Sequence, residues 1–165
     1  MLKAIVMGVA GSGKSSVGYA VAERLGAVYF DGDDLHPQSN IDKMAAGTPL
    51  DDSDRAPWLD KVGAALAQAT GPTLIGCSAL KRAYRDRIRA ACPQMQCAHL
   101  VGARSVIEER MSARTGHFMP VILLDSQFAT LEPLQPDEAG ISVDISLEFN
   151  AVVGEMAERL AAQMT

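Results

Sequence analysis

The 165-residue sequence predicts an α/β protein built on a five-stranded parallel sheet with helices on both faces. Three observations lead to this prediction. Short apolar runs alternate with longer amphipathic segments five times over, which is the pattern of parallel strands joined by right-handed crossovers. The strand candidates are continuously apolar, as expected of strands covered on both faces. No repeat or linker divides the chain, so we expect one domain over residues 1–165.

Local signals place the elements of the first half of the chain. After a first strand, an apolar stripe at Val17, Val21 and Leu25 indicates a helix that Gly26 ends. The acidic run at 51–54 is typical of a helix start, and an apolar stripe follows it. That stripe consists of Leu59, Val62 and Leu66. A shorter helix is expected at 41–46.

The second half continues the alternation. A basic helix is expected at 81–91 with its charges on the outer face, and Pro93 marks its end. A helix around Val106 and Arg110 precedes a polar stretch, and a further helix follows that stretch at 121–131. The final helix carries the apolar residues Phe149, Val153, Met156 and Leu160. The five strands are predicted at 2–7, 28–30, 73–77, 95–101 and 141–145.

The sequence G-V-A-G-S-G-K-S at Gly8–Ser15 lies between the first strand and the first helix. It matches the phosphate-binding pattern G-x-x-x-x-G-K-[ST] in a strand–loop–helix context. Glycines let the backbone wrap closely around an anion, and the free N–H groups of the first helical turn point toward it. Lys14 supplies a charge for the β- and γ-phosphates, and the Ser15 hydroxyl is suited to Mg²⁺. The motif predicts a nucleoside triphosphate site.

Carboxylates follow the second strand at Asp31, Asp33 and Asp34. In an open parallel sheet, ligands bind beyond the carboxyl ends of the strands, so these side chains should lie beside the phosphate loop. Phosphoryl transfer to a hydroxyl needs a carboxylate that orients the nucleophile, and often another near the magnesium ion. The alternative is an Asp-rich turn that caps a helix.

Basic residues follow the third and fourth strands. Lys81 and Arg82 come after the third strand, and Arg104, Arg110 and Arg114 come after the fourth. Arginines that close over a triphosphate would stabilise the charge of the transferring group and exclude water. Surface charge explains the same residues equally well.

Charge, cysteine spacing and hydropathy argue against nucleic-acid-binding, cysteine-metal and membrane proteins. The formal net charge is −5 and no basic stripe is present, so nucleic-acid binding is not expected. Cys77, Cys92 and Cys97 lack metal-ligand spacing, and reduced thiols are expected. With no signal peptide or membrane-spanning run in view, we expect a cytoplasmic protein that does not bind membranes.

Longer motifs make the sequence similar to the gluconokinase family over nearly its whole length. They are F-D-G-D-D-L-H-P at 30–37, N-I-D-K-M at 40–44, P-L-D-D-S-D-R-A-P-W-L at 49–59, C-S-A-L-K at 77–81, G-H-F-M-P at 116–120 and L-L-D-S-Q-F at 123–128. The resemblance implies a three-layer P-loop kinase fold with a lid at about 104–120. It implies ATP- and Mg²⁺-dependent conversion of D-gluconate to 6-phospho-D-gluconate, in carbohydrate acid catabolism, by a homodimer.

The resemblance also implies roles for individual residues. Lys14, Asp33, Arg110 and Arg114 would be catalytic, and Ser15 and Asp31 would hold Mg²⁺. Asp33, His36, Arg55, Lys81 and His117 would bind the sugar acid. ATP would be bound by Gly8, Val9, Ala10, Gly11, Ser12, Gly13, Lys14, Ser15 and Ser16, although Ser16 stands where threonine is usual.

Two alternatives share some of these features. Shikimate kinase or another small-metabolite kinase would have the loop, the carboxylates after the second strand and the lid. A nucleotide-dependent switch would have the loop, but it would need no second-substrate pocket. The D-G-D-D-L-H-P and H-F-M-P motifs favour gluconate.

Overall fold

The computed structural model describes residues 1–112 and 121–164. It contains a sheet of five parallel strands in the order β2-β3-β1-β4-β5. The predicted five-stranded parallel sheet is therefore confirmed. The strands are β1 Lys3–Met7, β2 Val28–Asp31, β3 Thr73–Gly76, β4 Gln96–Val101 and β5 Gly140–Asp144.

Seven helices lie in the described part of the chain, with one short 3-10 helix. They are α1 Lys14–Leu25, η1 Gly32–Leu35, α2 Gln38–Ala45, α3 Asp52–Gln68, α4 Arg82–Ala91, α5 Arg104–Ser112, α6 Val121–Thr130 and α7 Phe149–Ala162. None of these is long and apolar enough to cross a membrane. The α2 helix begins before the predicted 41–46, directly after Pro37, whose fixed φ suits a helix start.

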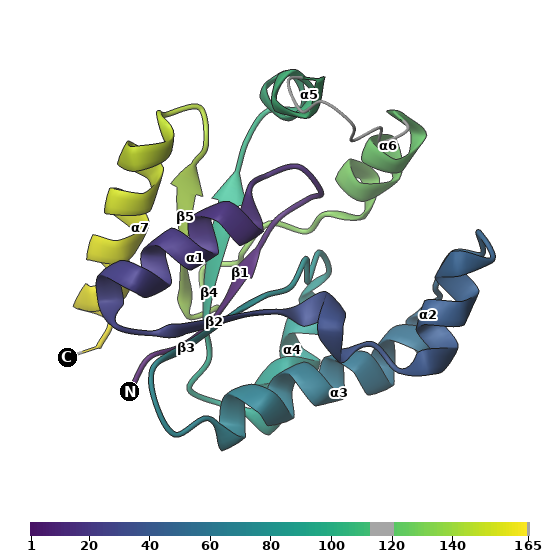
Figure 1. The fold of residues 1–165 in the computed structure, drawn as a ribbon, viewed down its shortest axis with the longest axis horizontal. Coiled ribbons are helices and arrows are strands. Elements are labelled where there is room, and N and C mark those ends of the chain that lie inside the picture. The colour runs from purple at the N-terminus through teal and green to yellow at the C-terminus, as the bar shows by residue number, and fades with distance from the viewer. Residues whose placement is uncertain (113–120, 165) are drawn as a thin grey trace.

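Two hydrophobic cores form on opposite faces of the sheet. Side chains alternate along a strand, so Ala4 and Val6 face one core while Ile5 and Met7 face the other. Figure 1 shows α1 and α7 covering the first face and α3 and α4 covering the second. The predicted three-layer arrangement is thereby confirmed.

The chain leaves β1 toward β2 and β3 on one side and later returns to β4 on the other. In such a sheet, a crevice forms beyond the carboxyl end of the central strand. The loop after β1, η1 after β2 and the loop between β3 and α4 therefore meet at one edge of the sheet.

One detail of the predicted helices is wrong, and one apolar residue of the final helix is exposed. Arg85 does not lie on an outer face of α4, because its side chain is 0% exposed and pairs with Glu138. Phe149 is exposed rather than buried, because it is the first residue of α7, whose buried residues begin at Val152.

His99 on β4 gives a prediction about acid stability. The residue is 2% exposed, and burial, aided by the positive charge of Arg85, lowers its pKa to about 4. When a histidine has a lower pKa in the folded state, the protein loses stability as the pH falls below the pKa of that histidine in the unfolded chain. The reason is that only the unfolded chain takes up the proton readily. The expected loss from this histidine between pH 7 and pH 5 is about 2 kcal/mol. His99→Gln should remove this component, which urea unfolding at the two pH values would measure.

Candidate active site

The phosphate loop has the backbone that its glycines permit. Gly11 and Gly13 have φ angles of 80° and 94°, in the left-handed region, and α1 begins at Lys14. The Ser12 hydroxyl is fully buried and has no hydrogen-bond partner among the described residues. The N–H groups in the first turn of α1 have no partner within the helix, and proteins bind phosphate at such a helix N-terminus.

Lys14 folds back onto the loop. Its Nζ donates to the carbonyl oxygens of Gly8 at 3.0 Å and Val9 at 3.1 Å. It forms no ion pair with a carboxylate in the described part of the chain. Burial lowers the pKa of Lys14, while the negative charge of Asp33 opposes that effect. An ammonium group held in this way fits an anion that would supply the missing counter-charge.

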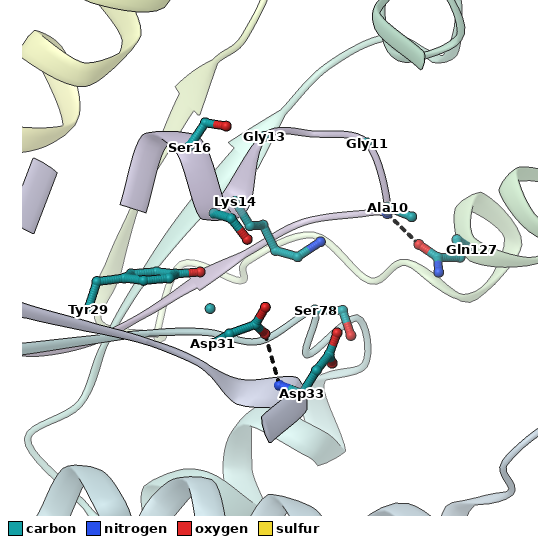
Figure 2. Close-up of a pocket in the computed structure, with 12 residues that line it drawn as sticks. Ala10, Gly11, Gly13, Lys14, Ser16, Tyr29, Asp31, Asp33, Ser78 and Gln127 are labelled. Atoms are coloured by element: carbon teal, nitrogen blue, oxygen red, sulfur yellow. Dashed lines mark hydrogen bonds between the residues drawn. The ribbon is translucent and has the colours of Figure 1, made fainter. Parts of the chain in front are cut away.

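A cavity of about 320 Å³ opens in front of the loop. Figure 2 shows Lys14, Asp31 and Asp33 converging on this space, with Ser78 beside Asp33. Ala10, Gly11, Gly13, Ser15 and Ser16 of the predicted nucleotide site also line it. The structure therefore brings the phosphate loop and the carboxylates after β2 into one pocket.

The two carboxylates in the pocket have different environments. The Asp31 Oδ1 accepts a hydrogen bond from the Asp33 backbone N–H at 2.9 Å and so caps η1. The Asp33 carboxylate projects into the pocket, and no backbone N–H of the described residues donates to it. The Asp33 side chain is 81% exposed, yet partial desolvation in the pocket and then the negative charge of Asp31 raise its pKa. A carboxylate of raised pKa is suited to accept a proton from a hydroxyl.

The pocket includes two side chains that sequence reasoning missed. Gln127 on α6 reaches the phosphate loop, where its Oε1 accepts a hydrogen bond from the Ala10 N–H at 2.6 Å. Tyr29 on β2 fills space that Gly18 and Gly76 leave open, since a Cβ at either position would lie within 2.2 Å of the tyrosine. Burial raises the pKa of Tyr29 to about 12. No local spacing signals either residue, because each contacts a distant segment.

Arg55 of α3 and Lys81 before α4 meet at one carboxylate. Arg55 Nη1 lies 3.6 Å from Asp52 Oδ1, and Lys81 Nζ lies 3.7 Å from Asp52 Oδ2. The Tyr84 hydroxyl donates to Asp52 at 2.5 Å. Both cations also lie over the Tyr84 ring, at 5.7 Å and 5.5 Å from its centroid. Two cations converging on one carboxylate form an arrangement that can bind a second carboxylate.

His36 lies on the Asp33 side of the site instead. Its Nε2 is 3.9 Å from Asp33 Oδ1, and its ring stacks on Trp58 with centroids 4.2 Å apart. The Trp58 Nε1 donates to the Gly32 carbonyl oxygen at 2.8 Å, which ties the stack to η1.

The predicted lid residues are only partly described. Arg110 donates to the carbonyl oxygens of Ile145 and Leu147 after β5, and it does not line the pocket. Arg114 and His117 lie outside the described residues. The structure thus does not bring Arg110 to the phosphate loop, and its assigned role stays a prediction.

Comparison with known proteins decides the family. No family model matches the sequence. The chain is 45% identical over 158 residues to the thermosensitive gluconokinase of Escherichia coli strain K12, covering 94% of this chain and 83% of that protein. This protein belongs to the gluconokinase family. A crystal structure of a gluconokinase from Sinorhizobium meliloti 1021 has a TM-score of 0.90 and 46% identity, covering 98% of this chain and 92% of that one.

A more distant likeness concerns the fold alone. Shikimate kinase from Aquifex aeolicus has a TM-score of 0.63 with 14% identity, covering 98% of this chain and 97% of that one. The gluconokinase-family protein therefore has a P-loop kinase fold, and its sequence similarity lies with gluconokinases.

Proposed function

We propose that this protein transfers the γ-phosphoryl group of ATP to the terminal hydroxyl of D-gluconate and forms 6-phospho-D-gluconate. The observation that carries this proposal is that the phosphate loop and the carboxylates of Asp31 and Asp33 line one pocket. We infer that the acceptor is gluconate because the protein belongs to the gluconokinase family. Kinases of this kind use ATP, commonly with Mg²⁺.

The donor half of the proposed site is the loop from Gly8 to Ser16. Its N–H groups and Lys14 would bind the phosphates, for which Lys14 must leave its carbonyl partners. Ser15 and Asp31 would hold Mg²⁺. The ion would neutralise phosphate charge as it develops.

Asp33 would act on the acceptor. The gluconate hydroxyl oxygen attacks the γ-phosphorus in line, the bond to the bridging oxygen breaks, and ADP leaves. The hydroxyl proton goes to Asp33, whose raised pKa suits it to this role. Arg110, Arg114 and His117 remain our candidates for a lid, and we expect a cytoplasmic homodimer.

A coupled assay tests the proposed function. ATP is presented with gluconate, shikimate, nucleosides and gluconamide, the neutral amide of the same polyol. We expect turnover with gluconate and little with the others. Preference for shikimate would overturn the proposal, and ATP binding without turnover of any acceptor would indicate a switch.

The Arg55–Lys81 cluster gives a second prediction. Arg55→Ala and Lys81→Ala should each raise KM for gluconate by roughly 10–100-fold, because a charged hydrogen bond contributes about 1.5–3 kcal/mol. They should also weaken the preference for gluconate over gluconamide. Arg87→Ala is the matched control, since Arg87 pairs with Asp60 on the exposed surface. Unchanged gluconate kinetics in both cluster variants would contradict the assignment.

A further inference from the structure

Asn40 on α2 is a buried polar residue that the proposed reaction does not use. It is 2% exposed, and its Nδ2 makes two contacts. It donates to the Asp54 carbonyl oxygen at 2.9 Å and lies 3.2 Å from His36 Nδ1. A carbonyl oxygen only accepts, so the contact with Asp54 fixes which end of the amide is the NH₂ group. The second amide hydrogen therefore faces the imidazole.

The orientation of Asn40 determines the tautomer of His36. Because Asn40 donates to Nδ1, that nitrogen must be unprotonated, and the ring proton lies on Nε2. The imidazole side chain is 6% exposed and stacked on Trp58, with 16° between the rings, so it cannot rotate freely. The protonated Nε2 therefore lies 3.9 Å from Asp33 Oδ1.

We propose that Asn40 is a positioning residue that holds His36 as the neutral Nε2–H tautomer beside Asp33. The proposal rests on the role of Asp33 in the proposed phosphorylation. Nε2 and Oδ1 are too far apart for a direct hydrogen bond, but a hydroxyl beside the pair can lie within hydrogen-bond distance of both atoms. That hydroxyl would give its proton to Asp33 while it accepts a hydrogen bond from Nε2–H.

The neutral state of His36 follows from the same contact, because an imidazolium carries N–H on both ring nitrogens and offers Asn40 no acceptor. Protonation at Nδ1 would place its N–H against the amide hydrogen of Asn40, so Asn40 opposes it. Two charged groups act on the ring: Asp33 favours the imidazolium, and Arg55 on α3 disfavours it. Burial lowers the pKa of His36 further.

The test is a long-range ¹H–¹⁵N spectrum of the full-length protein without substrates, with the His36 signals assigned by their loss in His36→Gln. At pH 7, His36 should show the signature of the Nε2–H tautomer. In Asn40→Asp the new carboxylate accepts from Nδ1–H, so the imidazolium signature should persist to higher pH. An Nδ1–H tautomer in the wild type would overturn the proposal even if the enzyme phosphorylates gluconate, and this readout needs no acceptor.

Kinetics supply the second readout. Asn40→Asp should lower kcat/KM for gluconate at pH 7 by roughly 10–100-fold, the loss typical when the outer hydrogen-bond partner of a metal-bound histidine is replaced. KM for ATP should not change. Gln38→Glu is the matched control, because it makes the same amide-to-acid change on the exposed face of α2. Equal effects of the two variants would indicate a charge effect and contradict positioning by Asn40.

Discussion

Replacement of Asp33 by asparagine is expected to lower kcat for gluconate phosphorylation by about 10²–10⁴-fold. Asparagine has nearly the same size, but its amide cannot take the proton of the attacking hydroxyl. Lys14 and the loop N–H groups are unaltered, so KM for ATP should change little. Steady-state assays with each substrate varied in turn would separate these effects.

Asp34→Asn is the control for this prediction. It removes a carboxylate from the same turn, but Asp34 does not line the pocket at the phosphate loop. We expect its kcat to remain near that of the wild type. Equal losses in the two variants would show that the net charge of the turn matters, rather than a base at Asp33.

The same assignment of Asp33 predicts the direction in which the pH dependence of kcat/KM is shifted. Because the pKa of Asp33 is raised, the acidic limb of kcat/KM should lie at higher pH than an ordinary aspartate would give. Residual activity in Asp33→Asn should lack that limb. A limb that is unchanged in the variant would have to come from another group.

The contiguous parts of this site could be predicted from the sequence. The phosphate loop occupies Gly8–Ser15, and its geometry depends on its own glycines and the helix that follows. The carboxylates of Asp31 and Asp33 could be placed because parallel strands end at the same edge of a sheet. In the first case, the backbone conformation is determined by residues close together in the sequence. In the second case, the position of the side chains follows from the sheet topology.

The contacts between distant segments could not be predicted in this way. Gln127 meets Ala10 across 117 residues, and Asn40 joins His36 to the backbone of α3. A glutamine or asparagine within a helix is ordinary by composition. Only the packed structure shows that Asn40 is buried and has a specific partner on each side.

The environment of Arg85 also could not be predicted from the sequence. It stands among other arginines in α4, so the local pattern indicates a solvated face. Its partner, Glu138, is 53 residues away. Two parallel hydrogen bonds of 2.7 and 2.9 Å join the guanidinium to that carboxylate, and both side chains are 0% exposed. Burial would raise the pKa of Glu138, but its hydrogen bonds outweigh burial and lower it well below the ordinary value.

Arg85→Met is expected to destabilise the protein by about 3–5 kcal/mol, because it leaves a buried carboxylate without its main partner. Arg87→Met on the same helix is the control. Its ion pair with Asp60 is about half exposed, at 48% and 55%, and exposed pairs contribute about 0–1 kcal/mol. Urea unfolding would compare the two variants. A loss in Arg85→Met no larger than in Arg87→Met would contradict the buried-pair argument.

Besides pairing with Glu138, Arg85 holds a loop of the proposed acceptor site. Its Nη1 donates to the carbonyl oxygens of Ala79 at 3.0 Å and Leu80 at 3.3 Å, in the loop that carries Ser78 and Lys81. Ala79 has a φ of 41°, a conformation that non-glycine residues rarely adopt and that its surroundings must hold.

The double variant Arg85→Met, Glu138→Leu separates these two roles of Arg85. It removes both buried charges, so much of the lost stability should return. The carbonyl oxygens of Ala79 and Leu80 would still lack their donor, so KM for gluconate should stay raised while KM for ATP does not. Recovery of both stability and gluconate KM would show that Arg85 contributes to the fold alone. If stability recovers while KM for gluconate stays raised, Arg85 also fixes the loop that presents Lys81.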